Sequence, residues 1–281
     1  MSGEIRVWVN GRLVEPDTPA LAALDHGVTV GDGVFETVKI EHGRTFALRR
    51  HHERLLRSAA GLGLPDIDLD LLGEGIAAVL EGTDIDLGRL RYSVTGGAGP
   101  LGSDRLPSAP TYIVLAGPQP RPPDSGAVVV VPWTRNERSA VAGLKTTSYA
   151  ENVIALEYAQ QRGGVEAVFA NTRGELCECT GSNIFVVRAG EVLTPPVEAG
   201  LLPGITRGLT IEWAGVSGIP VQETALPLRV LDEADEVFIT STTKDILAVH
   251  AVDGRALPGD RPVTTRLQQV FRENAAGNPD P

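Results

Sequence analysis

The apolar positions in the first part of the chain change period several times, from two to nearly four and back. Alternation with period two predicts strands, and the turn Asn10–Gly11 between two such stretches predicts a type I′ hairpin, since both residues tolerate positive φ. Apolar residues spaced three and four apart predict helices. We expect strands at residues 5–9, 12–14, 34–40, 45–48, 90–95 and 112–115, and helices at 51–62 and 71–80. The first part of the chain is therefore expected to be α/β.

A segment rich in proline and glycine interrupts this pattern. Residues 117–126 read GPQPRPPDSG, with four prolines and two glycines in ten positions, a composition that neither a helix nor a central strand accepts. Because 281 residues exceed the usual size of one core, we expect two domains that meet here. The expected organisation is a small N-terminal domain at 1–116, a linker at 117–125 and a large C-terminal domain at 126–281.

Strands and helices alternate again beyond the linker. Strands are expected at 128–132, 167–170, 184–187 and 237–240, and helices at 149–162, 205–217 and 262–272. The tail after Arg272 is polar and is expected to fray. The fold class predicted for the whole chain is α/β, or α+β.

Charge and apolar runs exclude two classes of partner. A formal net charge of -11 and a pI near 5.0 argue against nucleic acid and anionic membranes, which attract basic surfaces. The longest apolar run, Ala127–Trp133, is too short to span a bilayer. Residues Met1–Glu15 alternate like a strand and lack the apolar core of a signal peptide, so we expect a cytoplasmic protein.

The spacing of cysteine and histidine indicates neither a disulfide nor a metal site. Cys177 and Cys179 form a single C-x-C pair, which supplies too few thiols for a disulfide framework or a four-ligand site. His51, His52 and Glu53 are adjacent on a predicted helix and therefore point apart. We expect no bound metal, and we expect both cysteines to pack as small residues in or beside a strand.

Lysine is scarce in this sequence. The chain has 22 arginines but only three lysines, namely Lys39, Lys145 and Lys244. A desolvated lysine can lose its proton and condense with an aldehyde, whereas a guanidinium stays charged. Lys145 lies between small and apolar residues, just before a helix that Ser148 is placed to cap. A lone lysine in such a place is more often a surface residue, so this setting alone does not establish catalysis.

A spaced pattern around this lysine carries a family resemblance. Residues 178–185 read ECTGSNIF, 192–194 read VLT, and 202–207 read LPGITR. Three shorter pieces stand in the same order: GDGVFET at 31–37, His51-x-x-Arg54-Leu55, and TSTT at 240–243. In residue type and gap length the chain resembles the class IV aminotransferases over nearly its whole length. The resemblance implies a two-domain pyridoxal-phosphate enzyme of fold type IV, with a mixed sheet or barrel in the larger domain, assembled at least as a homodimer.

The resemblance also implies roles for individual residues. Lys145 would carry pyridoxal 5′-phosphate as a Schiff base and then move the proton between the substrate and the cofactor. Glu178 would face the pyridine nitrogen and favour its protonated form. Arg54 would bind the phosphate through two parallel hydrogen bonds. The remaining phosphate ligands would be Ile205 and Thr206 at a helix start, with Ser241 and Thr242.

Four further residues are weaker candidates. Tyr149 would reach the cofactor or the lysine, although a tyrosine that packs its helix is as good an interpretation. Thr180 and Gly181 would lie on the substrate side of the ring. Arg91 precedes the stretch expected to select the substrate and would bind a carboxylate, unless it is a strand arginine facing solvent.

The choice of substrate depends on the stretch 94–103, VTGGAGPLGS. D-amino-acid transaminases of the bacillus type carry an R-x-H carboxylate trap here, and this chain has neither residue. We expect a D-amino-acid transaminase with a non-standard carboxylate site, which transfers an amino group to a 2-oxo acid, and (R)-amines are further candidate donors. An aminodeoxychorismate lyase is the close alternative, and a branched-chain L-amino-acid transaminase comes third.

Two rival classes have weaker support. Residues 97–102, GAGPLG, fit the dinucleotide-binding pattern G-x-G-x-x-G, but Pro100 interrupts the turn where a helix would have to open. A binding module that has lost catalysis is the other rival. Retention of Lys145, Glu178 and Arg54 together argues against it.

Overall fold

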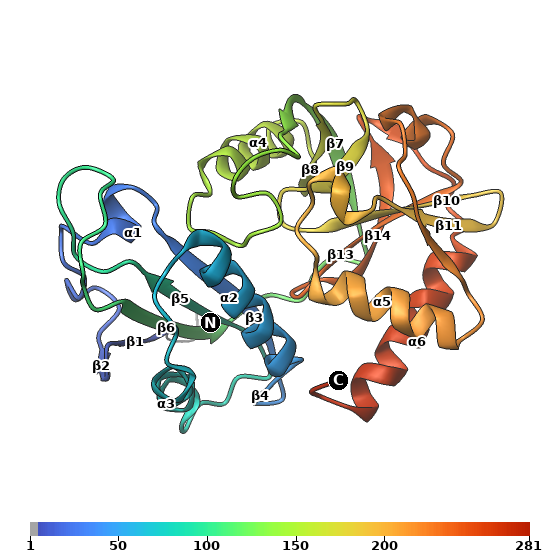
Figure 1. Cartoon of the computed structure of the whole chain (residues 1–281). Coiled ribbons are helices and arrows are strands. Elements are labelled where there is room, and N and C mark those ends of the chain that lie inside the picture. Colours follow the sequence, from blue (N-terminus) through green and yellow to red (C-terminus); the bar gives the residue numbers. More distant parts are fainter. Residues whose placement is uncertain (1–4) are drawn as a thin grey trace. The chain divides into compact units, whose positions relative to one another are not determined.

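A computed structural model describes residues 5–281 and divides the chain into two compact units (Figure 1). Unit 1 comprises Met1–Arg121, Leu144–Ser148 and Pro279–Pro281, and unit 2 comprises Pro122–Gly143 and Tyr149–Asn278. The part of the expected N-terminal strand pattern at residues 1–4 lies outside the described residues. The short segment that carries Lys145 thus belongs to unit 1, although the sequence on both sides of it belongs to unit 2.

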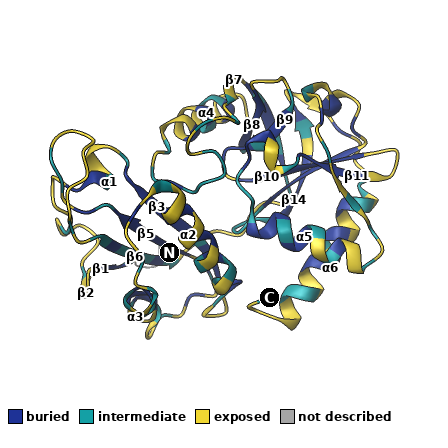
Figure 2. Ribbon diagram, in the orientation of Figure 1, coloured by how far each residue is buried: buried dark blue, intermediate teal, exposed yellow. Residues whose placement is uncertain are grey.

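Unit 1 is built on an antiparallel sheet of six strands in the order β2-β1-β6-β5-β3-β4. Helix α2 (Leu48–Leu62) packs on β3, and α3 (Leu69–Leu80) packs on β1 and β6. The core between them includes Trp8, Leu55 and Tyr92, all buried (Figure 2). The other elements are β1 (Arg6–Val9), β2 (Arg12–Val14), α1 (His26–Thr29), β3 (Gly33–Glu41), β4 (Arg44–Thr45), β5 (Leu87–Thr95) and β6 (Thr111–Pro118).

Buried charges join α2 to β3. Glu36 is fully buried on β3, and its carboxylate accepts hydrogen bonds from Nε and Nη2 of Arg54, each at 2.7 Å. His51, one turn earlier on α2, places Nδ1 at 2.7 Å from the same carboxylate and donates to it, since a carboxylate only accepts. Burial alone raises the pKa of Glu36, but Arg54 and His51 outweigh it and hold that pKa far below its ordinary value.

The C-terminal tail supplies the start of α2. Ala47 precedes the helix in a left-handed conformation and has no side-chain acceptor for the first-turn amides. Its own N–H donates to the carbonyl of Pro279 at 2.7 Å, and the Asp280 carboxylate accepts from the backbone N–H of Arg49 at 3.0 Å. The expectation that the tail frays is wrong, because the carbonyl of Pro279 and the carboxylate of Asp280 accept hydrogen bonds from backbone N–H groups at the start of α2.

Unit 2 is built on a mixed sheet of nine strands, in which β11–β12, β14–β7 and β7–β8 are the parallel pairs. The path runs β12-β11-β10-β13-β14-β7-β8-β9, and β15 also pairs with β14. The strands are β7 (Ser125–Arg135), β8 (Glu166–Asn171), β9 (Leu176–Cys179), β10 (Asn183–Arg188), β11 (Glu191–Thr194), β12 (Val221–Glu223), β13 (Glu236–Ser241), β14 (Asp245–Val252) and β15 (Arg255–Ala256).

Helices cover this sheet and aromatic contacts fix them. Helix α4 (Ala150–Gln160) packs on β7 and β8, while α5 (Ile205–Val216) and α6 (Pro262–Gly277) pack on each other and on β13 (Figure 1). Trp213 and Phe271 join α5 to α6 through a T-shaped contact with centroids 5.0 Å apart. Two 3-10 turns complete the unit, η1 (Val197–Ala199) and η2 (Leu228–Asp232).

The α/β fold class is confirmed, and the expected strands and helices match elements of the structure, except the strand expected at 45–48, where β4 ends at Thr45 and α2 already begins at Leu48. A second detail is also wrong. Helix α4 has Tyr149 as its N-cap, and the hydroxyl of Ser148 donates instead to the carbonyl of Gly31 at 3.0 Å. Ser148 is thus committed to unit 1 and does not cap the helix.

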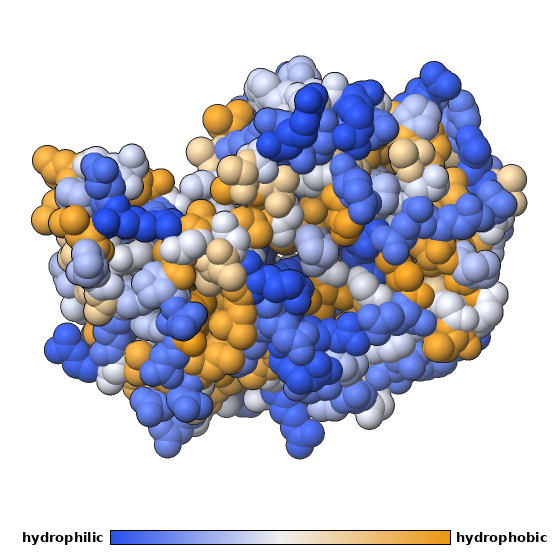
Figure 3. Space-filling view, in the orientation of Figure 1, coloured by the Kyte–Doolittle hydropathy of each residue, from blue (hydrophilic) through white to orange (hydrophobic). Residues whose placement is uncertain are grey.

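No helix within residues 5–281 combines the length and the apolar character needed to cross a membrane. The face seen in Figure 3 mixes hydrophilic and hydrophobic residues. Scattered apolar residues of this kind are normal on a protein surface.

Replacing Glu36 with glutamine should destabilise unit 1 in a pH-dependent way. The amide keeps the shape but leaves the charge of Arg54 buried without a partner, so the free energy of unfolding near pH 7 should fall by about 3–5 kcal/mol. Because the pKa of Glu36 lies below its ordinary value of 4.5, its contribution is complete above that pH and is lost as pH falls through the folded-state pKa. Denaturant unfolding should therefore show a smaller difference in unfolding free energy between the wild type and Glu36→Gln near pH 3 than near pH 7.

Glu53→Gln is the matched control, since Glu53 lies on the same helix but is half exposed and pairs with Arg49. It should change the unfolding free energy by under about 1 kcal/mol. A Glu36→Gln effect of equal size at both pH values would contradict the charge-based origin.

Candidate active site

The backbone of Lys145 is fixed by β3 and α2 of unit 1. The carbonyl of Lys145 accepts from the N–H of Phe35 at 3.1 Å, and its own N–H donates to the hydroxyl of Ser58 at 3.1 Å. Thr146 forms an antiparallel bridge with Val34. Segment 144–148 thus lies along β3 as a short added strand, and the direction of the lysine side chain follows from that pairing.

Two cationic side chains contact the ring of Phe35. Nζ of Lys145 lies 4.4 Å from the ring centroid, and Cζ of Arg91 lies 3.8 Å from the same centroid. Arg91 reaches the ring from β5, where it stands opposite Thr37. An aromatic face attracts both groups through its quadrupole. Arg91 is therefore not a strand arginine that simply faces solvent, because it contacts the same ring as the candidate lysine.

Arg54 lies on the same face of α2 as Ser58, one turn earlier. Its contacts to Glu36 use Nε and Nη2, and a guanidinium carries five N–H donors in one plane. The bidentate pair with Glu36 therefore fixes the orientation of the whole guanidinium. The role of Glu36, which lies inside the GDGVFET motif, was missed by the sequence-based reasoning.

In unit 2, Glu178 on β9 is held from two sides. Its Oε2 accepts from the N–H of Leu202 at 2.9 Å, and Nε of Arg135 lies 3.2 Å from Oε1. Arg135 is itself fixed, because Nη2 donates to Asn152 at 2.9 Å and Cζ lies 4.2 Å above the ring of Phe169. Arg135 balances the charge of Glu178. Nothing in the spacing of the sequence identified it.

The residues of the spaced signature fix the start of α5. Gly204 is the N-cap, and a Cβ there would lie 2.0 Å from Oδ1 of Asn183. The other end of that amide donates from Nδ2 to the carbonyl of Leu202 at 2.9 Å. Farther along, the hydroxyl of Thr194 donates to the carbonyl of Ile184 at 2.8 Å. Asn183 and Gly204 of the signature therefore fix the position of the first amides of α5, at Ile205 and Thr206, while Thr194 joins β11 to β10.

The end of β13 lies next to this helix start. Thr240 is the register partner of Asn183, and Ser241 follows it, with Thr242 in the turn beyond. Within the described chain, the buried Oγ of Ser241 has no hydrogen-bond partner. An orphaned hydroxyl of this kind needs an explanation, and a bound acceptor such as a phosphate oxygen provides one. Unit 2 thus gathers Glu178, the start of α5 and Ser241 at one end of the β9–β10–β13 group.

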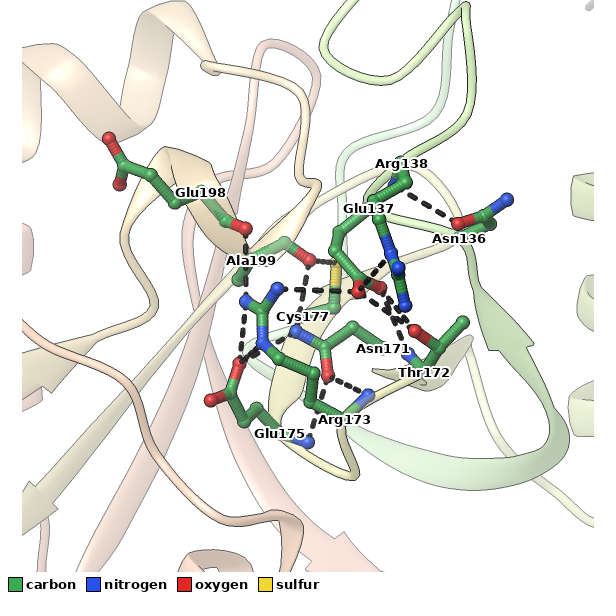
Figure 4. A network of polar contacts seen from close by, with 10 residues as sticks. All are labelled: Asn136, Glu137, Arg138, Asn171, Thr172, Arg173, Glu175, Cys177, Glu198 and Ala199. Carbon is green, nitrogen blue, oxygen red and sulfur yellow. Dashed lines mark hydrogen bonds and ion pairs between the residues drawn. The ribbon is translucent and has the colours of Figure 1, made fainter.

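The connection that leads from β7 towards Lys145 is anchored by a polar network (Figure 4). Glu137 accepts from the N–H of Thr172 at 3.1 Å and from its hydroxyl at 2.8 Å, and Arg173 pairs with both Glu137 and Glu175. Hydrogen bonds from Thr172, together with Arg173, keep the pKa of Glu137 below its ordinary value. The connection at 136–143 is therefore held at its first residues to the turn that follows β8.

Both cysteines are packed residues, as expected. Cys177 and Cys179 are free and buried, and the thiol of Cys177 donates to the carbonyl of Ala199 at 3.2 Å. Burial raises the pKa of each thiol well above its ordinary range. Neither is a nucleophile.

Comparison with known proteins places this geometry in a family. The sequence profile described as amino-transferase class IV matches residues 33–252. A Methanocaldococcus jannaschii protein named "Putative branched-chain-amino-acid aminotransferase" is 35% identical over 96% of each chain. A D-alanine aminotransferase of Listeria monocytogenes is 33% identical, also over 96% of each chain.

Solved structures agree in fold. A branched-chain aminotransferase from Thermoproteus uzoniensis superposes with a TM-score of 0.90 at 30% identity, covering 98% of this chain and 95% of that one. A Mycobacterium tuberculosis protein described as a hypothetical aminotransferase, in its PLP-bound form, gives a TM-score of 0.83 at 26% identity, over 97% and 98% of the two chains. The chain belongs to the class IV aminotransferase family, and its cofactor is pyridoxal 5′-phosphate.

Proposed function

We propose that the chain transfers an amino group between a D-amino acid and a 2-oxo acid in a ping-pong cycle, with Lys145 as the catalytic amine. The observation that carries an amino acid as the substrate is the contact of both Arg91 and Lys145 with the Phe35 ring, while the D configuration is taken from the family resemblance. A guanidinium on the same aromatic ring as the reactive amine suits a substrate that bears a carboxylate next to its amino group. An amino acid fits that requirement, whereas a simple amine does not.

The residues of the candidate site fit pyridoxal 5′-phosphate. Its phosphate is a dianion, and in unit 2 the first amides of α5 at Ile205 and Thr206 and the orphaned hydroxyl of Ser241 are suitable donors. The family resemblance adds the guanidinium of Arg54 from unit 1. Thr242 lies beside Ser241 in the same turn. Glu178, held by Leu202 and Arg135, offers a carboxylate to a protonated ring nitrogen. When bound, this cofactor supplies the electron sink that labilises the bonds to Cα of the substrate.

Each protein group then has a defined task. Nζ of Lys145 takes the proton from Cα of the amino acid and returns one in the reverse half-reaction. Arg91 orients the substrate carboxylate. Thr180 and Gly181 line the substrate side of the ring, and Tyr149, at the N-cap of α4, assists in holding the ring oxygen.

We further propose that the enzyme acts in the cytoplasm as a homodimer. Two free cysteines and the acidic composition are compatible with a reducing compartment. The dimer is proposed from the family resemblance.

A branched-chain L-amino-acid transaminase is the second candidate. It is favoured by the 35% identical M. jannaschii relative and by the T. uzoniensis structure. The absence of the R-x-H pair from residues 94–103 also favours it, because that pair marks one group of D-specific enzymes.

Lys145 should be the residue to which the cofactor is attached. Purified protein should be yellow, and borohydride should remove the colour and fix a label on the peptide that contains Lys145, detected by mass spectrometry. Peptides with Lys39 and Lys244 serve as internal controls and should stay unlabelled. Lys145→Ala should lower turnover by at least roughly 10²–10⁴-fold, because it removes the group that moves the proton. Label on another lysine would contradict the assignment.

The substrate class can be decided by half-reactions followed from the cofactor spectrum. D-Alanine should convert the enzyme to its pyridoxamine form, and (R)-1-phenylethylamine should react at least about 10-fold more slowly, because it has no carboxylate for Arg91. Arg91→Met should slow the half-reaction with D-alanine and leave the one with (R)-1-phenylethylamine unchanged, so the ratio of the two rates should fall. Conversion by L-leucine and not by D-alanine would replace the proposal with the branched-chain one. Release of pyruvate from aminodeoxychorismate without conversion would indicate the lyase.

Gly204→Ala should weaken cofactor binding. The added Cβ would lie 2.0 Å from Oδ1 of Asn183, so the start of α5 must move. The backbone N–H groups of Ile205 and Thr206 would then no longer point at the phosphate. The Kd for pyridoxal phosphate, titrated on apoenzyme, should rise by about 10-fold or more, which corresponds to roughly 1.4 kcal/mol. Gly208→Ala on the same helix is the control, since its Cβ meets nothing closer than 4.0 Å, and its Kd should stay unchanged.

A further inference from the structure

Glu166 is a buried carboxylate with four donors and no part in the proposed chemistry. It begins β8, and its side chain is 3% exposed. Oε2 accepts from the N–H of Gly181 at 2.8 Å and from the hydroxyl of Thr180. Oε1 accepts from the hydroxyl of Ser182 at 2.9 Å and from Nζ of Lys244. Each oxygen thus receives two hydrogen bonds, which satisfies the carboxylate completely.

The four donors come from two separate turns. Thr180, Gly181 and Ser182 form the turn that follows Glu178 and leads into β10, which we name the β9–β10 turn. Lys244 ends the turn between β13 and β14, which contains Thr242 and directly follows Ser241. One side chain therefore holds both turns at a fixed spacing, although they are about sixty residues apart along the chain.

The charge of the pair explains why the contact persists. Burial raises the pKa of Glu166, but the ammonium of Lys244 and the hydroxyl of Thr180 outweigh that effect and keep the pKa below its ordinary value. Glu166 thus remains an anion at neutral pH and an acceptor for every donor. The side chain of Lys244 is 24% exposed, so removing it leaves a smaller packing defect than removing Glu166.

Stability alone is a poor reason for such a pair. A buried ion pair costs desolvation, and apolar residues of similar volume often stabilise a fold as well or better. Buried hydrogen-bonded charges are more useful where a particular geometry has to be kept. The two turns held by Glu166 are those that carry the proposed substrate-side residues and the proposed phosphate ligands.

We propose that Glu166 is a positioning residue that, together with Lys244, sets the spacing between the substrate-side turn at Thr180–Ser182 and the phosphate-side turn at Thr242–Lys244. This inference rests on the proposed function, because it takes from it the roles of Thr180, Gly181 and Thr242. Glu166 itself acts only through the two turns, and its loss changes the geometry of groups that touch cofactor and substrate.

The test compares Glu166→Gln, Lys244→Met and the double variant with the wild type. Glutamine keeps the shape of Glu166 but turns one acceptor into a donor, so at least one of the four hydrogen bonds is lost. Four quantities are measured on each holoenzyme or its reconstituted form: the Kd for pyridoxal phosphate, kcat and KM for the best amino donor, and the melting temperature. Both single variants should raise Kd and KM by about 10-fold while kcat falls less. The double variant should raise Kd and KM little beyond the values of the single variants, because both substitutions break the same contact.

Two further variants separate positioning from stability. Lys244→Arg keeps a cationic donor and should restore Kd and KM to within about threefold of the wild type. Glu236→Gln is the matched control, since Glu236 is also buried and accepts from the backbone N–H groups of Val263 and Thr264, where it caps α6. It should lower the melting temperature and leave Kd and KM unchanged.

Each result decides the inference. If Glu166→Gln and Lys244→Met lower only the melting temperature, as Glu236→Gln does, then the pair is structural and the inference is wrong. If Glu166→Gln does not fold, the partly exposed Lys244→Met decides by the same criteria. A wild type that binds the cofactor but accepts no D-amino acid defeats the proposed substrate, while the Kd measurements still test the positioning role.

Discussion

The approach of the Asn183 amide to the backbone of Gly204 is the contact on which the candidate site of unit 2 depends. A Cβ on residue 204 would overlap Oδ1 of Asn183, and Nδ2 of the same amide binds the carbonyl of Leu202. Leu202 in turn donates its N–H to Glu178. A single side chain thus sets where α5 begins and how the carboxylate of Glu178 is presented, and the same strand pairing brings Ser241 alongside.

Three carboxylates of the described chain follow one rule. Glu36, Glu166 and Glu178 are buried or nearly so, and each lies beside a cation, respectively Arg54, Lys244 and Arg135. An unpaired charge in such a place would be neutralised or would destabilise the fold. Paired, each carboxylate keeps its charge and fixes the direction of its partner. The buried charges therefore orient side chains and turns, while the apolar clusters of each unit supply the core.

The sequence indicated the candidate site residues better than the residues that hold them in position. Scarcity singled out Lys145 as a candidate and the spaced signature supported it, and the same signature indicated Glu178, because that signature is a local pattern. Glu166 stands in the apolar strand EAVFAN, and its partners lie 14 to 78 residues away, so no local spacing identifies it. Helix α2 was predicted from its apolar period, but its start was not. Asp280, which accepts a hydrogen bond from the first turn of α2, is 231 residues away from Arg49 along the chain. Contacts of this kind exist only after the chain has folded.

The residues expected to select the substrate, 94–103, are held by close contacts within the protein. Gly97 and Gly99 are required there by close contacts, with Ala109 and with His26, that a Cβ would block. Arg105, the one arginine of residues 96–110, donates to Asp32 of the GDG motif and to the carbonyl of Gly63. These contacts engage all three nitrogens of the Arg105 guanidinium, since Nε and Nη2 both bind Asp32 and Nη1 binds the carbonyl of Gly63. This supports assigning the substrate carboxylate to Arg91, which stands on a central strand of the sheet of unit 1, where the backbone fixes its position better than a loop would.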